Sequence, residues 1–175
     1  MTVMSKKEAL SEFQTRLTGR LQSASDVGGH GNAHWLAVEI AGQGFMFPLS
    51  HSGEIFPWFE PQPIPYAKEW FLGVANLRGA LCGVVSLAKY FNLETGDSAL
   101  GATKATMQDR RLIGFHPSLD LNTVLVVDRL VGLKSRHQMT ETDAANQYRD
   151  QQDIIWQEVD LRFLAQDPAF ISIAQ

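Results

Sequence analysis

The chain has 175 residues, of which 45% are hydrophobic and 19% charged, so it can bury a sizeable core and is not expected to be disordered. Its formal net charge of −4 argues against a nucleic-acid-binding protein, because contacts to phosphates usually require a surplus of basic residues. The single cysteine, Cys82, excludes an intrachain disulfide and a zinc site built from several thiolates, and its apolar neighbours predict a small buried side chain.

Residues 5–24 have the pattern of an amphipathic helix. Ser5 followed by Glu8 fits a capping box, and apolar residues recur at spacings of three and four: Leu10, Phe13, Leu17 and Leu21. Four basic and two acidic residues give the first 25 positions a net charge of +2. The helix either packs on its own domain or docks to a partner. A Gly-rich linker over residues 25–34 follows, so we expect an N-terminal unit of residues 1–33 and a main domain of residues 34–175.

The segment that precedes the linker has no apolar core of the kind found in secretory leaders. No apolar stretch approaches the ~20 residues that are needed to span a bilayer. We therefore expect a cytoplasmic protein without a transmembrane segment.

After the linker the apolar pattern changes to the alternation of β-strands. Trp35–Ile40 and Phe45–Leu49 are predicted to form a hairpin, and residues 71–85 two strands that meet at Arg78-Gly79. Prolines between residues 57 and 65 impose extended, irregular chain between these hairpins. Ser86 is expected to cap a short helix over Leu87–Phe91.

The second half of the chain predicts another hairpin and a long acidic loop. Small polar residues over 94–108 indicate an exposed loop, and residues 110–115 and 122–128 a hairpin around Pro117-Ser118. Residues 137–160 carry six acids against Arg149, so we expect mostly solvated loop, interrupted by a short strand at 154–156. Asp160 is expected to cap a final helix. The strand-rich sections 35–93 and 110–160 are predicted to form two small barrels.

Motifs for catalysis are not found in the sequence. It contains no Gly-x-Ser-x-Gly elbow, no Walker phosphate loop and no Gly-x-Gly-x-x-Gly fingerprint. His51 and His116 are expected to lie exposed in turns, and the acids of the second half to stay solvated. We therefore expect no catalytic residues, no metal site and no cofactor.

One motif stands out, the segment Gly73-Val74-Ala75-Asn76-Leu77-Arg78-Gly79. An arginine inside an apolar run is either a structural residue that donates to backbone carbonyls or a five-donor group that is presented to a partner. The chemistry of the residues leaves these two interpretations open.

This segment resembles the signature of the CheW-like family of chemotaxis adaptors, a Gly-Val-x-Asn-Leu-Arg-Gly turn followed by Pro-Val-x-Asp-Leu and a short helix. Here Gly83 replaces the proline and Ser86 the aspartate, while Val84 and Leu87 remain. Gly53 stands where the family usually has an apolar residue. The resemblance covers roughly residues 34–174, and its other matching parts are Trp35–Leu49, Glu54-Ile55 and Val126–Leu130.

The resemblance implies a mainly β fold, with two five-stranded SH3-like β-barrels that share a hydrophobic core, next to the N-terminal amphipathic helix and short helices. It implies a noncatalytic adaptor at membrane-associated arrays, whose partners are the cytoplasmic tip of a chemoreceptor and the regulatory domain of a histidine kinase. The partner-binding residues carried over from the motif are Asn76, Leu77, Arg78, Gly79, Val84 and Leu87.

The basic helix before the barrels and the divergent second half of the motif are more similar to the adaptors of type IV pilus (twitching motility) systems than to flagellar ones. The alternative is a small-ligand-binding or enzymatic barrel protein with a pocket between the two lobes. An enzyme pocket would require titratable groups that converge in an apolar cleft.

Removing residues 1–33 is expected to leave a folded protein with little change in melting temperature and weaker partner binding. The reason is that burying four apolar side chains contributes about as much free energy as ordering the helix and the linker costs. Thermal unfolding of the full and shortened chains measures this. A melting temperature ~10 °C or more lower, or aggregation, would place the helix in the core.

Overall fold

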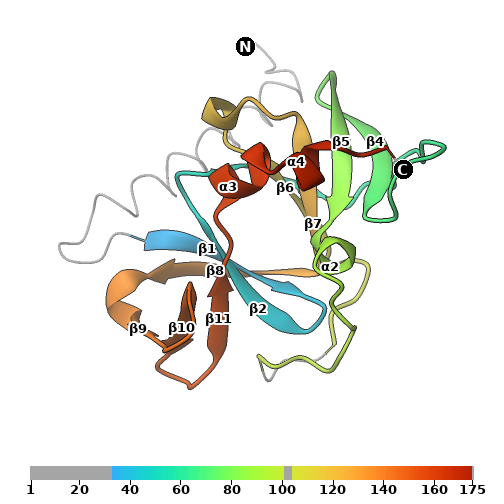
Figure 1. The fold of residues 1–175 in the computed structure, drawn as a ribbon. Coiled ribbons are helices and arrows are strands. Elements are labelled where there is room, and N and C mark those ends of the chain that lie inside the picture. The colour runs from blue at the N-terminus through green and yellow to red at the C-terminus, as the bar shows by residue number, and fades with distance from the viewer. Residues whose placement is uncertain (1–32, 101–103, 175) are drawn as a thin grey trace, which may run out of the picture.

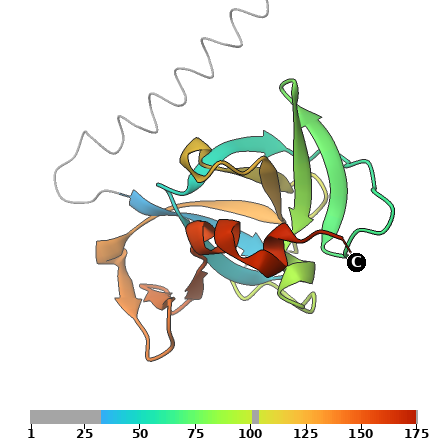
Figure 2. The ribbon, with the colours of Figure 1, turned by 45° about the horizontal axis from the view of Figure 1, so that its top comes forward.

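The computed structural model describes residues 33–100 and 104–174 (Figure 1). The predicted N-terminal helix and most of its linker lie outside these residues. The described chain is mainly β, as the sequence predicts, and its strands form two sheets that curl into separate SH3-like lobes (Figures 1 and 2). None of the helices in the described residues is long and apolar enough to cross a membrane.

One sheet has six strands and the other has five. The six-stranded sheet has the order β8-β1-β2-β11-β10-β9, with strands β1 (Ala33–Ile40), β2 (Gln43–Pro48), β8 (Arg129–Ser135), β9 (Met139–Glu141), β10 (Gln147–Asp150) and β11 (Ile155–Glu158). The five-stranded sheet has the order β3-β6-β7-β5-β4, with strands β3 (Ser52–Pro57), β4 (Phe71–Leu77), β5 (Ala80–Ser86), β6 (Arg111–Phe115) and β7 (Thr123–Val127).

The two lobes are not consecutive halves of the chain, as the division into 35–93 and 110–160 assumed. β11 joins the first hairpin by pairing parallel to β2, and β7 joins the second by pairing parallel to β5. Each sheet thus combines early and late segments. The reason is that each hairpin forms from neighbouring residues, whereas the strand that pairs with its second strand, β11 beside β2 and β7 beside β5, comes from much later in the sequence.

The three predicted hairpins are confirmed: β1–β2, β4–β5 and β6–β7 are antiparallel pairs. The connection between β6 and β7 contains a 3₁₀ helix, η1 (Pro117–Leu119), and a second one, η2 (Arg136–Gln138), joins β8 to β9. β3 was not predicted, because the prolines from residue 57 onward indicated irregular chain. The strand can form because Pro57 stands at the last position of an edge strand, where a missing N–H is tolerated.

The short helices begin where capping residues predict them. The Ser86 hydroxyl accepts from the Lys89 N–H at the start of α2 (Leu87–Tyr90). The Asp160 carboxylate accepts from two N–H groups at the start of α3 (Leu161–Gln166), and the Asp167 carboxylate accepts from one, that of Ala169, at the start of α4 (Pro168–Ile171). Both C-terminal helices lie across the junction of the two lobes (Figure 2).

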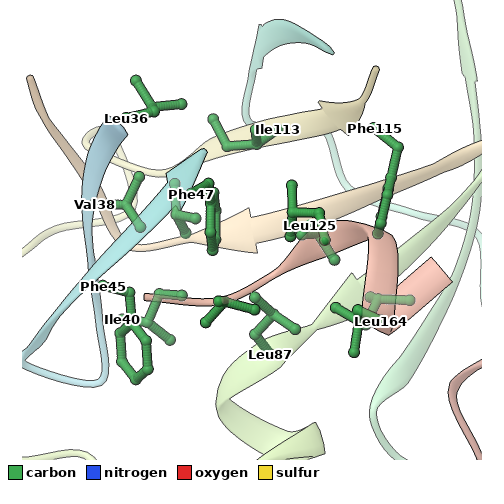
Figure 3. Packing of buried hydrophobic residues seen from close by; sticks show 14 of the residues in the cluster. Leu36, Val38, Ile40, Phe45, Phe47, Leu87, Ile113, Phe115, Leu125 and Leu164 are labelled. Atoms are coloured by element: carbon green, nitrogen blue, oxygen red, sulfur yellow. The ribbon is translucent and has the colours of Figure 1, made fainter. Parts of the chain in front are cut away.

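The main hydrophobic core lies between the sheets and is shared by both lobes (Figure 3). Alternation along a strand divides its side chains between two cores. Leu36 and Val38 of β1 point into the shared core, whereas Trp35 and Ala37 pack inside the six-stranded lobe. β7 does the same with Leu125 in the shared core, and its neighbours Val124 and Val126 pack inside the five-stranded lobe.

The prediction of a mostly solvated loop over residues 137–160 is only partly right. Most of these residues are exposed and the expected strand at 154–156 is present as β11, but the region also forms β9 and β10. One of its acids, Asp150, is buried and accepts hydrogen bonds from the Trp156 indole at 2.9 Å and from the N–H groups of Gln152 and Ile154. Lys134 Nζ lies 3.4 Å from the same carboxylate. Burial by itself raises the pKa of Asp150, but these hydrogen bonds outweigh it and lower the pKa.

Three smaller expectations also change. His51 is buried rather than exposed, with its Nδ1 3.4 Å from an Asp160 carboxylate oxygen, and burial lowers its pKa. Cys82 is only half-buried, and burial raises the pKa of its thiol. The loop after α2 is not wholly exposed: Ser98 donates to the buried Glu39 at 3.0 Å, and Leu100 packs against the interior of the six-stranded lobe. His116 is exposed, as expected.

Asp150→Ala is expected to lower the free energy of unfolding by about 3 kcal/mol, because it leaves a buried indole N–H and two backbone N–H groups without an acceptor. Since folding lowers the pKa of Asp150, its contribution is present at neutral pH and is lost as the pH falls below about 4. Urea unfolding at pH 7 and pH 3 measures both effects. Asp143→Ala, at an exposed acid of the same region, is the control and should change little. Equal effects of the two substitutions would contradict the prediction.

Candidate partner-binding site

The predicted motif forms the tight turn between β4 and β5. Leu77 is paired with Ala80, so the turn consists only of Arg78 and Gly79, with φ values of 53° and 83°. Positive φ at both positions is the geometry that matches the right-handed twist of a hairpin. The Asn76 side-chain oxygen accepts from the Gly79 N–H at 2.9 Å. This hydrogen bond stabilises the turn, at which the Arg78 side chain is exposed.

Arg78 forms an ion pair across the lobe. Its Nη1 lies 2.5 Å from Oε1 of Glu54 on β3, and its guanidinium lies 5.8 Å from the ring centre of Phe56 on the same strand. β3 and β4 are the two edge strands of the five-stranded sheet. The contact therefore joins the first and last strands of a curled sheet, which closes the barrel at this end.

The arginine is not a buried strut that donates to backbone carbonyls. Its side chain is 55% exposed, and that of Glu54 is 42% exposed. The ion pair occupies part of the guanidinium and leaves the remaining donors facing solvent. The geometry is therefore compatible with the second interpretation of the sequence, a donor group that is presented to a partner.

The six predicted site residues do not form one surface. Asn76, Arg78 and Gly79 are exposed at the turn. Leu77 and Val84 belong to the interior of the five-stranded lobe, and Leu87 to the shared core, with Val84 and Leu87 fully buried. The three buried residues can act on a partner only through the support that they give to the hairpin and to α2.

Two surface residues were not among the predicted site residues. Glu54 is the partner of Arg78, and Leu81, paired with Asn76 across the hairpin, is 64% exposed. Sequence spacing gives no signal for the first, because 24 residues separate it from Arg78 and only the closure of the sheet brings them together. For Leu81, the available signal was the alternation of inward and outward side chains along β5, which begins at the turn. We call the surface formed by Glu54, Asn76, Arg78, Gly79 and Leu81 the turn patch.

The glycine at position 53 is explained by the approach of β3 to β6. A Cβ atom on Gly53 would lie 2.4 Å from the carbonyl oxygen of Phe115. An apolar side chain at this position would therefore push the two strands apart. The residue before Glu54 is thus small because β3 lies so close to its neighbour.

A cavity of about 500 Å³ lies between the lobes, under the chain that follows α2. Its acids already have partners. The carboxylate of Glu39, only 2% exposed, accepts from Ser98 and lies 3.6 Å from Arg129, while Asp128 accepts from the Ala41 N–H at 2.7 Å and lies 3.6 Å from Arg110. Within residues 33–100 and 104–174, no group of three or more His, Cys, Asp or Glu residues could hold a metal ion.

Comparison with known proteins identifies a family and similar proteins. Residues 34–163 match the model of the CheW-like domain. The protein PilI of Pseudomonas aeruginosa is 25% identical over 99 residues, which are 57% of this chain and 51% of PilI, so the match spans about half the length of that relative. The crystal structure of the scaffolding protein TtCheW from Thermoanaerobacter tengcongensis shares the fold, with a TM-score of 0.63 and 16% identity over 81% of this chain and 93% of TtCheW.

Gly79→Ala is expected to lower the free energy of unfolding by about 1–2 kcal/mol, because a Cβ atom is strained at a φ of 83° even though no neighbour lies within 4 Å. Gly96→Ala is the matched control: it also has open space around it, and its φ lies outside the left-handed region. Chemical denaturation of the two variants measures the difference. A loss at Gly96 as large as that at Gly79 would refute the assignment of the cost to backbone conformation.

Proposed function

The chain belongs to the family of CheW-like domains, and on this premise we propose that it is a noncatalytic adaptor that couples a chemoreceptor to a histidine kinase. The turn patch is the observation that carries the proposal. It combines an arginine with free donor capacity, an acid and an exposed leucine on a closed and well-packed barrel. Interface contacts are typically made by such arginines next to apolar side chains.

The proposed partners are the cytoplasmic tip of a chemoreceptor and the regulatory domain of the kinase. A receptor tip of helical structure would present carboxylates and apolar residues at helical spacing, which suits a patch that contains both Arg78 and the exposed Leu81. The likeness to PilI supports an assignment to a type IV pilus chemosensory system that controls twitching motility. In this role the protein acts in the cytoplasm, at membrane-associated receptor arrays.

The two acids that line the cavity between the lobes are hydrogen-bonded and ion-paired to other residues of the protein. This favours an adaptor over the alternative of an enzymatic or ligand-binding barrel. Glu39 and Asp128 are held by Ser98, Arg129, Arg110 and a backbone N–H of the β1–β2 turn. A carboxylate that is committed to such contacts is not available as a base without breaking them. The contacts of Asp128 instead join the two lobes, because Ala41 lies in the β1–β2 turn and Arg110 stands next to β6.

Arg78→Glu is expected to weaken the assembly of receptor and kinase by at least about tenfold while changing the free energy of unfolding by less than about 1 kcal/mol. The small effect on stability follows from the exposure of the Arg78–Glu54 pair. Co-sedimentation with receptor arrays and kinase measures assembly, and thermal unfolding measures stability. Loss of the cooperative unfolding transition would show instead that Arg78 is a structural residue.

The charge-swapped double variant, Glu54→Arg with Arg78→Glu, is the matched control. It restores an ion pair between β3 and the turn but inverts the charges that face outward. Assembly that stays weak in the double variant supports direct recognition by Arg78. Assembly that recovers fully would mean that only the closure of the barrel matters, and the turn patch would not be the contact surface.

A further inference from the structure

A second surface feature is not used by the proposed adaptor role. A groove of about 550 Å³ runs between β2, α2, β11 and α3. Its floor is formed by Phe45 and Phe91, whose rings stack with their centres 6.3 Å apart. We call it the α2–α3 groove.

The groove has an apolar rim that the described residues do not cover. Phe163 of α3, which lines the groove, is 72% exposed, and Phe91 on its floor is 36% exposed. Leu93 and Leu164 also line it. Burying such side chains is favourable in proportion to their apolar area, so a complementary apolar surface would bind here.

The charged residues that line the groove are all acidic. Glu158, Asp160 and Asp167 lie among its lining residues, and no basic residue does. Asp167 also accepts from the Tyr90 hydroxyl at 3.0 Å, and burial and this contact raise the pKa of Tyr90 to about 12. Arg162 lies beside the groove on α3, 3.8 Å from Asp160. Three acids beside one arginine leave the groove with a net negative charge, which favours an occupant that is both apolar and basic.

We propose that the amphipathic N-terminal segment of this same chain, residues 5–24, docks into the α2–α3 groove as a helix. Its stripe of Leu10, Phe13, Leu17 and Leu21 supplies the apolar face. Arg16 and Arg20 follow Phe13 and Leu17 by three residues, so in a helix they flank the stripe and are placed to pair with the acidic residues of the groove. Charge and hydrophobicity are thus complementary on both surfaces.

The connecting chain is long enough for this contact. The stripe ends at Leu21 and β1 begins at Ala33, and a linker of this length spans up to about 35 Å when extended. Phe45 on the groove floor is paired with Val38, five residues along β1 from Ala33, or about 17 Å at the rise of a strand. The linker therefore reaches the groove with length to spare.

Cross-linking in the full-length chain tests the proposal. In a Cys82→Ser background, Gln14→Cys is combined either with Arg162→Cys beside the groove or with Val131→Cys as control. Val131 is exposed on β8, where its neighbour Leu130 is paired with the same Val38 from the other side of β1, so the linker reaches it equally well. A short bismaleimide then reports which cysteines meet.

The expected result is an intramolecular cross-link that forms about tenfold faster at residue 162 than at residue 131, with few covalent dimers at about 10 µM protein, because a tethered segment has an effective concentration in the millimolar range. Leu17→Asp should remove the preference, and Thr15→Asp, on the opposite face of the expected helix, should leave it unchanged. Equal rates at the two positions overturn the proposal. Covalent dimers as the main product at residue 162 also overturn it, because the groove would then hold the segment of a second copy.

Discussion

The shared core between the two sheets is the constraint on which the rest of the structure depends. β1 and β2 are covered on both faces, by the shared core on one side and by the interior of the six-stranded lobe on the other. β6 and β7 are placed in the same way between the shared core and the interior of the five-stranded lobe. Neither lobe can therefore move as an independent domain, because the shared core is formed by side chains of both sheets.

This arrangement supports the proposed role of the turn patch in partner binding. Leu77 and Val84 anchor the β4–β5 hairpin inside its lobe, and Leu87 anchors the following helix in the shared core. The buried residues thereby fix the position of the hairpin, while the polar groups of its exposed tip are available to contact a partner. A binding surface that is ordered before its partner arrives loses less conformational entropy on association.

The sequence predicted those features that depend on neighbours along the chain. The hairpins follow from alternation, and the starts of α2 and α3 follow from the capping residues Ser86 and Asp160. It failed where an interaction joins distant segments. Glu54 and Arg78 are brought together by the closure of the sheet, which their spacing in the sequence does not indicate. Asp150 was predicted to be solvated like the other acids of its region, but in the fold it accepts hydrogen bonds from the Trp156 indole and two backbone N–H groups. The composition of residues 137–160 reports their charge but not the direction in which each carboxylate points.

The interleaving of early and late strands also bears on how the protein is made. β1 and β2 leave the ribosome long before β8 and β11, the strands that pair with their two outer edges. During synthesis the first hairpin therefore exposes two unpaired edges and the apolar faces that carry Trp35 and Phe47, both buried in the finished protein. Strand pairing over such separations is slow, since loop closure precedes the gain from contacts. The nascent chain thus has an interval of vulnerability to aggregation that ends only when the last third of the sequence has emerged.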